Sequence, residues 1–181
     1  VERMKREIGF FEGSILNNTP KIIVKDWLNK LIVREYLDGS TIDPLKHEDV
    51  IKIAKTFANI HEYGYSLGDS KYTNFIISNN SVYIVDAEQA IYTNRYEYMY
   101  WDIMVFLTTL IYSLIEKMNV KATSLSRNLI EIFINKYLEY GGERSERVLE
   151  CYNRFNYKAL IFILLPIPYS LYYVNALNKV L

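Results

Sequence analysis

The sequence has 181 residues, of which 50% are hydrophobic and 23% are charged. This length suits one domain with a sizeable core, or one domain and a small piece of another. Lys plus Arg and Asp plus Glu number 21 each, so the formal net charge is zero and we expect no nucleic-acid partner held by bulk electrostatics, although a local basic patch stays open. The single cysteine, Cys151, excludes an internal disulfide and a cysteine metal cluster, and we expect a cytoplasmic protein.

Two apolar segments raise the question of a membrane. Residues 103–115 are shorter than the roughly 20 apolar residues that cross a bilayer, and residues 159–174 are also short and contain Pro166 and Pro168. We expect both to be buried core helices and expect no membrane association. Attachment of the C-terminal segment to a membrane surface is the alternative. No signal peptide is expected, because the first residues are charged and lead into no long apolar run.

The N-terminal part of the chain predicts a helix followed by an antiparallel strand pair. Residues 1–12 have charges on one side and apolar residues at helical spacing on the other. Residues 21–24 and 30–36 are short apolar or β-branched runs separated by a polar turn, a pattern typical of paired strands. Asp38-Gly39-Ser40 then ends the second strand.

The middle of the chain predicts a helix and a hairpin. Residues 47–63 are amphipathic, and Gly64 ends the predicted helix because glycine adopts a left-handed cap without strain. Residues 74–78 and 81–85 predict two strands on either side of an Asn-Asn turn.

The remainder of the chain predicts mainly helices. Residues 93–100 are polar and aromatic, and we expect a loop there. Helical stretches follow at residues 101–118, 124–139 and 145–164, and a Pro-Ile-Pro kink leads to a short helix ending near Val180. Two small strand pairs followed by helices predict an α+β fold dominated by helix.

The densest set of signals lies in residues 54–90, AKTFANIHEYGYSLGDSKYTNFIISNNSVYIVDAEQA. A helix ends at Ile60-His61, Gly68-Asp69 follow, and Asn74 comes after four further residues. The hairpin then leads to Asp86. Asp-x4-Asn alone is common, but this ordered combination with a helix, a hairpin and a closing aspartate is specific.

This combination resembles the catalytic loop and metal-binding segment of the protein-kinase-like superfamily. The nearest resemblance is to its atypical branch: RIO kinases, the small kinase of the tRNA-modifying KEOPS complex, lipopolysaccharide kinases and aminoglycoside phosphotransferases. These families share the Gly-Asp pair. The resemblance covers roughly the whole chain and is sharp between residues 53 and 90.

The resemblance implies roles for four residues of this segment. Asp69 would accept or orient the proton of an attacking hydroxyl, and Lys71 would touch the transferred phosphate. Asn74 and Asp86 would bind Mg²⁺ through oxygen atoms, the ligand type that this hard cation requires. The implied cofactors are ATP and Mg²⁺. His61 would be structural, and we expect it to bind no metal.

Flanking segments agree with the family in order. REIGFFEGSILNNTPKII resembles the regulatory helix, in which Glu7 would pair with the ATP-binding lysine; Glu2 or a plain solvated carboxylate is the alternative. IVREYLDG resembles the hinge between the lobes, and residues Glu35, Tyr36 and Leu37 would bind adenine through the backbone; an edge strand and turn is the alternative. Asp102 resembles the aspartate that anchors the catalytic loop, although a helix N-terminal carboxylate is also expected there.

The sequence departs from the family in several places. The glycine-rich loop and the strand lysine would precede Val1, and no later segment or lysine substitutes for them. Either the chain is the back part of a longer protein or the gene lost its front. Leu67 replaces a histidine, Asp86-Ala87-Glu88 replaces Asp-Phe-Gly, and no Ala-Pro-Glu motif follows.

We therefore predict a protein-kinase-like α+β fold with a shortened N-lobe, formed by residues 1–38, and a mostly helical C-lobe, formed by residues 39–181. The predicted function is ATP- and Mg²⁺-dependent phosphoryl transfer to a hydroxyl of a protein or a small molecule. Lys71 favours a protein acceptor, whereas Asp-Ala-Glu favours a small molecule or an atypical protein kinase. A protein partner could complete the N-lobe. One alternative is a catalytically weak or inactive pseudokinase that serves as a binding or regulatory module. The other is a helical protein outside the kinase superfamily that acts in protein interaction or associates with a membrane.

Overall fold

The computed structural model describes residues 1–13, 19–118 and 122–181. Its helices are α1 (Glu2–Glu12), α2 (His47–Glu62), α3 (Tyr96–Met118), α4 (Ala122–Glu150), α5 (Phe155–Leu164) and α6 (Tyr169–Val180). Its strands are β1 (Ile22–Asp26), β2 (Leu31–Arg34), β3 (Ser40–Thr41), β4 (Tyr65–Ser66), β5 (Phe75–Ser78), β6 (Ser81–Ile84) and β7 (Ile91–Tyr92). Helix predominates over short antiparallel sheets, as the predicted α+β class requires.

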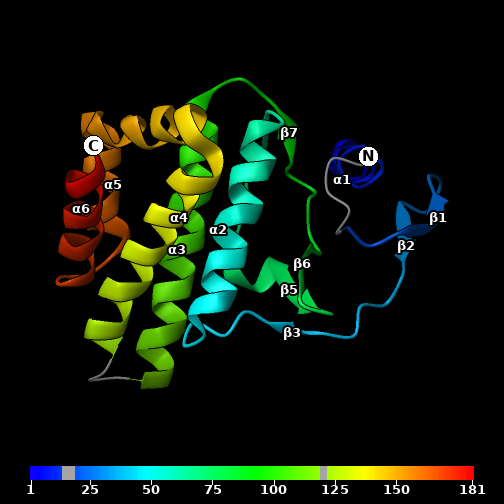
Figure 1. Cartoon of the computed structure of the whole chain (residues 1–181). Coiled ribbons are helices and arrows are strands. Elements are labelled where there is room, and N and C mark those ends of the chain that lie inside the picture. Colours follow the sequence, from blue (N-terminus) through cyan, green and yellow to red (C-terminus); the bar gives the residue numbers. More distant parts are fainter. Residues whose placement is uncertain (14–18, 119–121) are drawn as a thin grey trace.

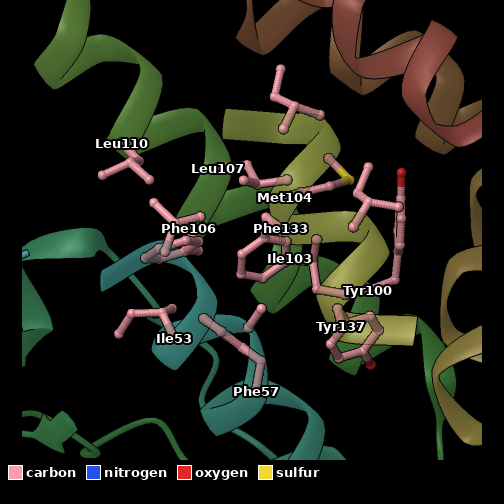
Figure 2. Close-up of a cluster of buried hydrophobic side chains, with 14 of the residues drawn as sticks. Ile53, Phe57, Tyr100, Ile103, Met104, Phe106, Leu107, Leu110, Phe133 and Tyr137 are labelled. Carbon is pink, nitrogen blue, oxygen red and sulfur yellow. The ribbon is translucent and has the colours of Figure 1, made fainter. Parts of the chain in front are cut away.

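Helices α2, α3 and α4 form the main core, and α5 and α6 cover its outer side near the C-terminus (Figure 1). The apolar stripe predicted for α2 is buried, and its Phe57 contacts Phe106 of α3 and Phe133 of α4 at ring-centroid distances of 5.2 and 5.7 Å. Figure 2 shows these three rings in one cluster. The core therefore fixes the end of α2, from which the candidate catalytic loop departs.

The predicted hairpin is present as strands β5 and β6. Asn79 and Asn80 both have positive φ, 47° and 64°, which is the conformation that a tight two-residue hairpin turn requires. Strand β3 pairs with the other edge of β5 and gives the order β3-β5-β6. The hairpin follows Asn74 directly, and Asp86 comes two residues after β6.

The predicted N-terminal helix and strand pair are also present, as α1 and the antiparallel strands β1 and β2. They lie to one side of the helical core (Figure 1). The contacts that join α1 to the helical half include a meeting of the Phe10 and Tyr65 rings at 5.5 Å and a 3.0 Å ion pair between Arg3 and Glu88. Part of the segment resembling the regulatory helix, residues 14–18, lies outside the described residues.

The loop predicted at residues 93–100 is confined to residues 93–95, and the prediction is wrong for residues 96–100, because α3 already begins at Tyr96. The backbone N–H of Arg95 donates to the hydroxyl of Thr93 just before the helix, at 3.1 Å. Met99 and Tyr100 are fully buried. This segment therefore forms the first turns of a core helix, and the burial of Met99 and Tyr100 outweighs the weak helical propensity of its aromatic residues.

The helix predicted at residues 145–164 is interrupted. Helix α4 continues from the preceding prediction through a break at Gly142 (φ 51°, ψ −137°) to Glu150. A 3-10 turn, Cys151–Asn153, follows, and extended backbone at Arg154 (φ −72°, ψ 132°) separates it from α5. No proline marks this second break, and the sequence pattern passes through it.

Helix α3 is longer than the apolar segment 103–115, whose shortness argued against a membrane-spanning helix. Residues Tyr96–Lys117 are long and apolar enough to cross a membrane by length and composition alone. However, 61% of the apolar window is buried inside the protein, and the core helix of a soluble protein meets the same criteria.

Candidate active site

The loop that carries Asp69 is shaped by two glycines. Gly64 ends α2 with φ +78°, as predicted, and its N–H donates to the carbonyl of His61. Gly68 has φ +75°, and a Cβ added there would lie 3.0 Å from the Cβ of Gln89. Glycine is required at this position both for its conformation and for the close approach of the segment that follows Asp86.

Asp102 anchors the start of this loop, as the resemblance implied. Its carboxylate is fully buried and accepts hydrogen bonds from the backbone N–H groups of Leu67 at 2.7 Å and Gly68 at 2.8 Å. The hydroxyl of Ser70 donates to the backbone carbonyl of Asp102 at 2.7 Å. The loop is therefore held on both sides of Asp69 by one turn of α3.

His61 takes part in the same buried network. Its Nδ1 lies 2.7 Å from the hydroxyl of Tyr137, and its Nε2 lies 3.4 Å from the carboxylate of Asp102. The His61 side chain is only 1% exposed, and the contacts tie α2, α3 and α4 together. This arrangement fits the structural role expected for His61.

The structure brings Asp69, Lys71 and Asn74 together. The side-chain Nδ2 of Asn74 donates to the backbone carbonyl of Asp69 at 2.8 Å, and Nζ of Lys71 lies 2.9 Å from Oδ2 of Asp69. The Asp69 side chain is 22% exposed and that of Lys71 is 54% exposed, so a bound molecule could reach both. The hydrogen bond that Lys71 donates to the carboxylate of Asp69 raises the pKa of Lys71 and favours its charged form.

Asp86 returns near Asn74, as predicted from the hairpin. The backbone N–H of Val85, the residue before Asp86, donates to the carbonyl of Asn74 at 2.9 Å. The carboxylate Oδ1 of Asp86 accepts a 3.2 Å hydrogen bond from the N–H of Glu88. These bonds place Asn74 beside the backbone of Asp69 and beside Val85, the residue before Asp86, where the loop and the hairpin join.

The available oxygen atoms fit a magnesium ion held partly by a ligand's phosphates. The hydrogen bonds given above use Nδ2 of Asn74 and Oδ1 of Asp86. Among the described residues, the other oxygen of each side chain, Oδ1 of Asn74 and Oδ2 of Asp86, has no hydrogen-bond partner. In the same part of the chain, no three His, Cys, Asp or Glu side chains cluster closely enough to form a metal cage. Mg²⁺ in proteins is usually bound by one or two protein side chains together with phosphate oxygens of the substrate.

Of the two glutamates considered in α1, Glu7 lies toward the site. Its Oε1 accepts a 2.8 Å hydrogen bond from Nη1 of Arg34, and its side chain is 15% exposed. Glu2 is exposed and pairs with Lys5 in its own helix. The structure therefore brings Glu7 to strand β2 and leaves Glu2 as a solvated helix carboxylate.

Glu7 gives a testable pH dependence of stability. Burial raises its pKa above the ordinary value of 4.5, Arg34 opposes this shift, and the charges of Asp86 and Glu88 add to it. Because the folded-state pKa lies above the unfolded one, the folded state binds more protons between the two values, and stability falls as pH rises through this window. We expect the wild type to lose free energy of unfolding relative to Glu7→Gln as pH rises from 4.5 to neutral.

Urea unfolding of both proteins across this pH range measures the effect. Glu7→Gln is the control for the wild type, because its amide does not titrate and the two proteins share all other carboxylates. A stability difference that does not change with pH would contradict the raised pKa of Glu7.

The predicted adenine-binding segment follows β2 directly. The backbone N–H of Glu35 donates to the carbonyl of Lys21 at 2.9 Å, and the side chain of Glu35 accepts from the N–H of Lys21 at 3.0 Å. Tyr36 is 89% exposed, and Leu37 is partly buried. Nothing in these contacts tests adenine binding, which stays a prediction.

Three residues of the site were missed from the sequence. Ser70 and Trp101 hold the loop, the latter through a 3.0 Å bond from its Nε1 to the carbonyl of Gly68. Arg34 joins Glu7 to the hairpin. Arg34 could have been noticed in the sequence, because it is a charged residue at the end of the apolar run LIVR. Ser70 and Trp101 carry no signal beyond their nearness to Asp69 and Asp102.

A comparison with known proteins points to the same superfamily as the sequence resemblance. The chain is 29% identical over 151 residues, 83% of this chain and 72% of the relative, to a protein of Archaeoglobus fulgidus named "Probable serine/threonine-protein kinase BUD32 homolog". No protein-family model matches the chain. The similarity is distant and supports the protein-kinase-like superfamily.

Proposed function

We propose that the chain is an atypical kinase-like phosphotransferase that moves the γ-phosphoryl group of ATP to a hydroxyl. The observation that carries the proposal is the junction of loop and hairpin. Asn74 donates a hydrogen bond to the carbonyl of Asp69, and the N–H of Val85 donates to the carbonyl of Asn74. In the proposal, these bonds position the carboxylates of Asp69 and Asp86 and the amide oxygen of Asn74. Phosphoryl transfer depends mainly on such positioning.

In this proposal, the backbone of residues 35–37 binds adenine, and Glu7 helps to order the phosphate end of the nucleotide site. Asn74 and Asp86 hold Mg²⁺, which when bound would neutralise negative charge on the phosphates. The nucleotide would lie between residues 1–38 and residues 39–181, the two lobes proposed for this chain.

Asp69 acts on the acceptor. Its carboxylate takes the proton of the attacking hydroxyl as the acceptor oxygen bonds to the γ-phosphorus, while the bond from that phosphorus to the β–γ bridging oxygen breaks and ADP leaves. Lys71, held beside Asp69, donates to an oxygen of the transferred group. A protein hydroxyl and a small-molecule hydroxyl both fit this chemistry.

The surface of β1 and β2 supports a covering segment or partner as part of the proposal. Both strands expose apolar side chains: Leu28 between them is 90% exposed, Ile23 is 64% exposed and Leu31 is 52% exposed. Burying these side chains would remove apolar area from water and stabilise the nucleotide-binding side.

The first test is thermal unfolding with and without Mg²⁺ and ATP. A ligand at 100 times its dissociation constant adds about 2.7 kcal/mol of stability, or roughly 5–10 °C for a chain of this size. We expect this shift in the wild type and its loss in Asp86→Asn. Glu146→Gln, which removes one exposed carboxylate charge from α4, serves as the matched control and keeps the shift.

The outcome also separates the enzyme from the pseudokinase. Binding followed by ADP production supports the transferase. Binding without any transfer, to water or to the chain itself, favours the pseudokinase. No Mg²⁺-dependent shift in the wild type would contradict nucleotide binding by this chain.

A further inference from the structure

Arg34 occupies a position that the proposed transfer chemistry leaves unexplained. It ends strand β2, immediately before the segment proposed to bind adenine. Its Nη1 donates both to Oε1 of Glu7 at 2.8 Å and to the backbone carbonyl of Val85 at 2.5 Å. One guanidinium therefore links helix α1, strand β2 and the residue that precedes Asp86.

The guanidinium is also held from the side. Its Cζ lies 5.4 Å from the centroid of the Phe11 ring, an arrangement that favours a cation. With Glu7 on one side and Phe11 on another, the side chain has little freedom to rotate. A planar cation fixed in this way is pre-organised to donate further hydrogen bonds.

Charge makes the position significant. Burial raises the pKa of Glu7, and the carboxylates of Asp86 and Glu88 lie close enough to add to this rise. A polyphosphate entering here meets negative charge on the protein and needs a fixed cation. Arg34 is 31% exposed, whereas Lys71 is 54% and Arg3 is 71% exposed, so Arg34 is the best shielded of the three cations paired with carboxylates around the site.

Two of the guanidinium's nitrogens remain for a ligand. Arginine carries five N–H groups, and both of the bonds described use Nη1. Within the described part of the chain, Nε and Nη2 of Arg34 have no hydrogen-bond partner. Guanidinium groups match the geometry of phosphate oxygens and bind them strongly.

We propose that Arg34 is the cation that orients the nucleotide's phosphates: Nη1 holds Glu7 and Val85 in place, and the remaining N–H groups donate to a phosphate oxygen. The inference rests on the proposed function, because it assigns a residue to that same nucleotide site. It also supplies a cation that the sequence, searched for a lysine, did not reveal.

The test compares ligands that differ only in phosphate. Calorimetry measures the affinity of Mg²⁺-ATP, Mg²⁺-ADP and adenosine for the wild type and for Arg34→Gln. We expect the variant to bind ATP and ADP about 10–100-fold more weakly, the range of a hydrogen bond to a charged group, and adenosine with unchanged affinity. Arg127→Gln, which removes the same charge from an exposed position on α4, leaves all three affinities unchanged.

Two further variants separate phosphate binding from other effects. Glu7→Gln and the double variant Arg34→Gln/Glu7→Gln remove the carboxylate that Arg34→Gln would leave unpaired. We expect the double variant still to bind ATP about tenfold more weakly than Glu7→Gln. Arg34→Lys keeps a charge but cannot hold Glu7, Val85 and a phosphate at once, so it weakens ATP binding more than adenosine binding even if Arg34→Gln fails to fold.

The outcomes distinguish the two proposals. Unchanged ATP affinity in Arg34→Gln, or an equal loss for ATP and adenosine, overturns the role of Arg34 and leaves the proposed function standing. A wild type that binds none of the three ligands overturns both. A selective loss for the phosphate-bearing ligands supports both.

Discussion

Replacement of Asp69 by asparagine is expected to lower phosphoryl transfer by about 10²–10⁴-fold, the usual contribution of a positioned base, without weakening Mg²⁺-ATP binding. The amide has a similar shape, and the bond from Asn74 survives because it ends on the backbone carbonyl of Asp69. What is lost is the carboxylate oxygen that takes the proton of the acceptor. The change therefore affects the chemical step and leaves the nucleotide site intact.

The measurement is ADP release with water as the acceptor, together with phosphate incorporation into the chain itself. Nucleotide affinity is measured on the same preparations, and Glu146→Gln is the matched carboxylate-to-amide control. Unchanged transfer by Asp69→Asn would remove Asp69 from the proposed mechanism. Loss of binding together with transfer would place Asp69 in the nucleotide site instead.

Asp102→Ala is expected to lower the free energy of unfolding by about 2–5 kcal/mol. The carboxylate is fully buried, and its removal leaves the backbone N–H groups of Leu67 and Gly68 without acceptors. His61 loses a partner as well. Buried donors that lose their acceptors carry the full cost of their desolvation.

Urea unfolding gives the size of this effect, and hydrogen exchange at the amides of Leu67 and Gly68 shows where it acts. Asp102→Asn is the informative companion, because one oxygen can still accept while the amide nitrogen faces the second N–H group. We expect it to lose less stability than alanine but to release one of the two amides to exchange. Wild-type exchange at both amides in the alanine variant would contradict the anchoring role.

The sequence predicted the parts of the fold that have a local cause. The apolar stripe of α2, the cap at Gly64 and the two-asparagine hairpin turn depend on neighbours along the chain, and all are present. The two-residue strands β3, β4 and β7 were not predicted, since pairs such as Tyr65 with Tyr92 depend on segments far apart in the sequence.

The site was predicted unevenly for the same reason. Asp69, Asn74 and Asp86 lie on one loop and its adjoining hairpin, so their spacing already brought them together. The Arg34–Glu7 pair spans 27 positions of the chain. No pattern in the chain specifies that contact, which arises from the placement of α1 beside β2.

The close approach at Gly68 has a consequence for motion. Because a Cβ at residue 68 would lie only 3.0 Å from the Cβ of Gln89, the loop bearing Asp69 cannot move closer to the segment after Asp86. Helix α1 contacts this part of the molecule through the Arg3–Glu88 ion pair, the Phe10–Tyr65 ring contact, and Glu7, whose partner Arg34 also bonds to the carbonyl of Val85; a movement of α1 would have to rearrange these contacts. We therefore expect a nucleotide-dependent movement of α1 to appear as a rearrangement of these contacts.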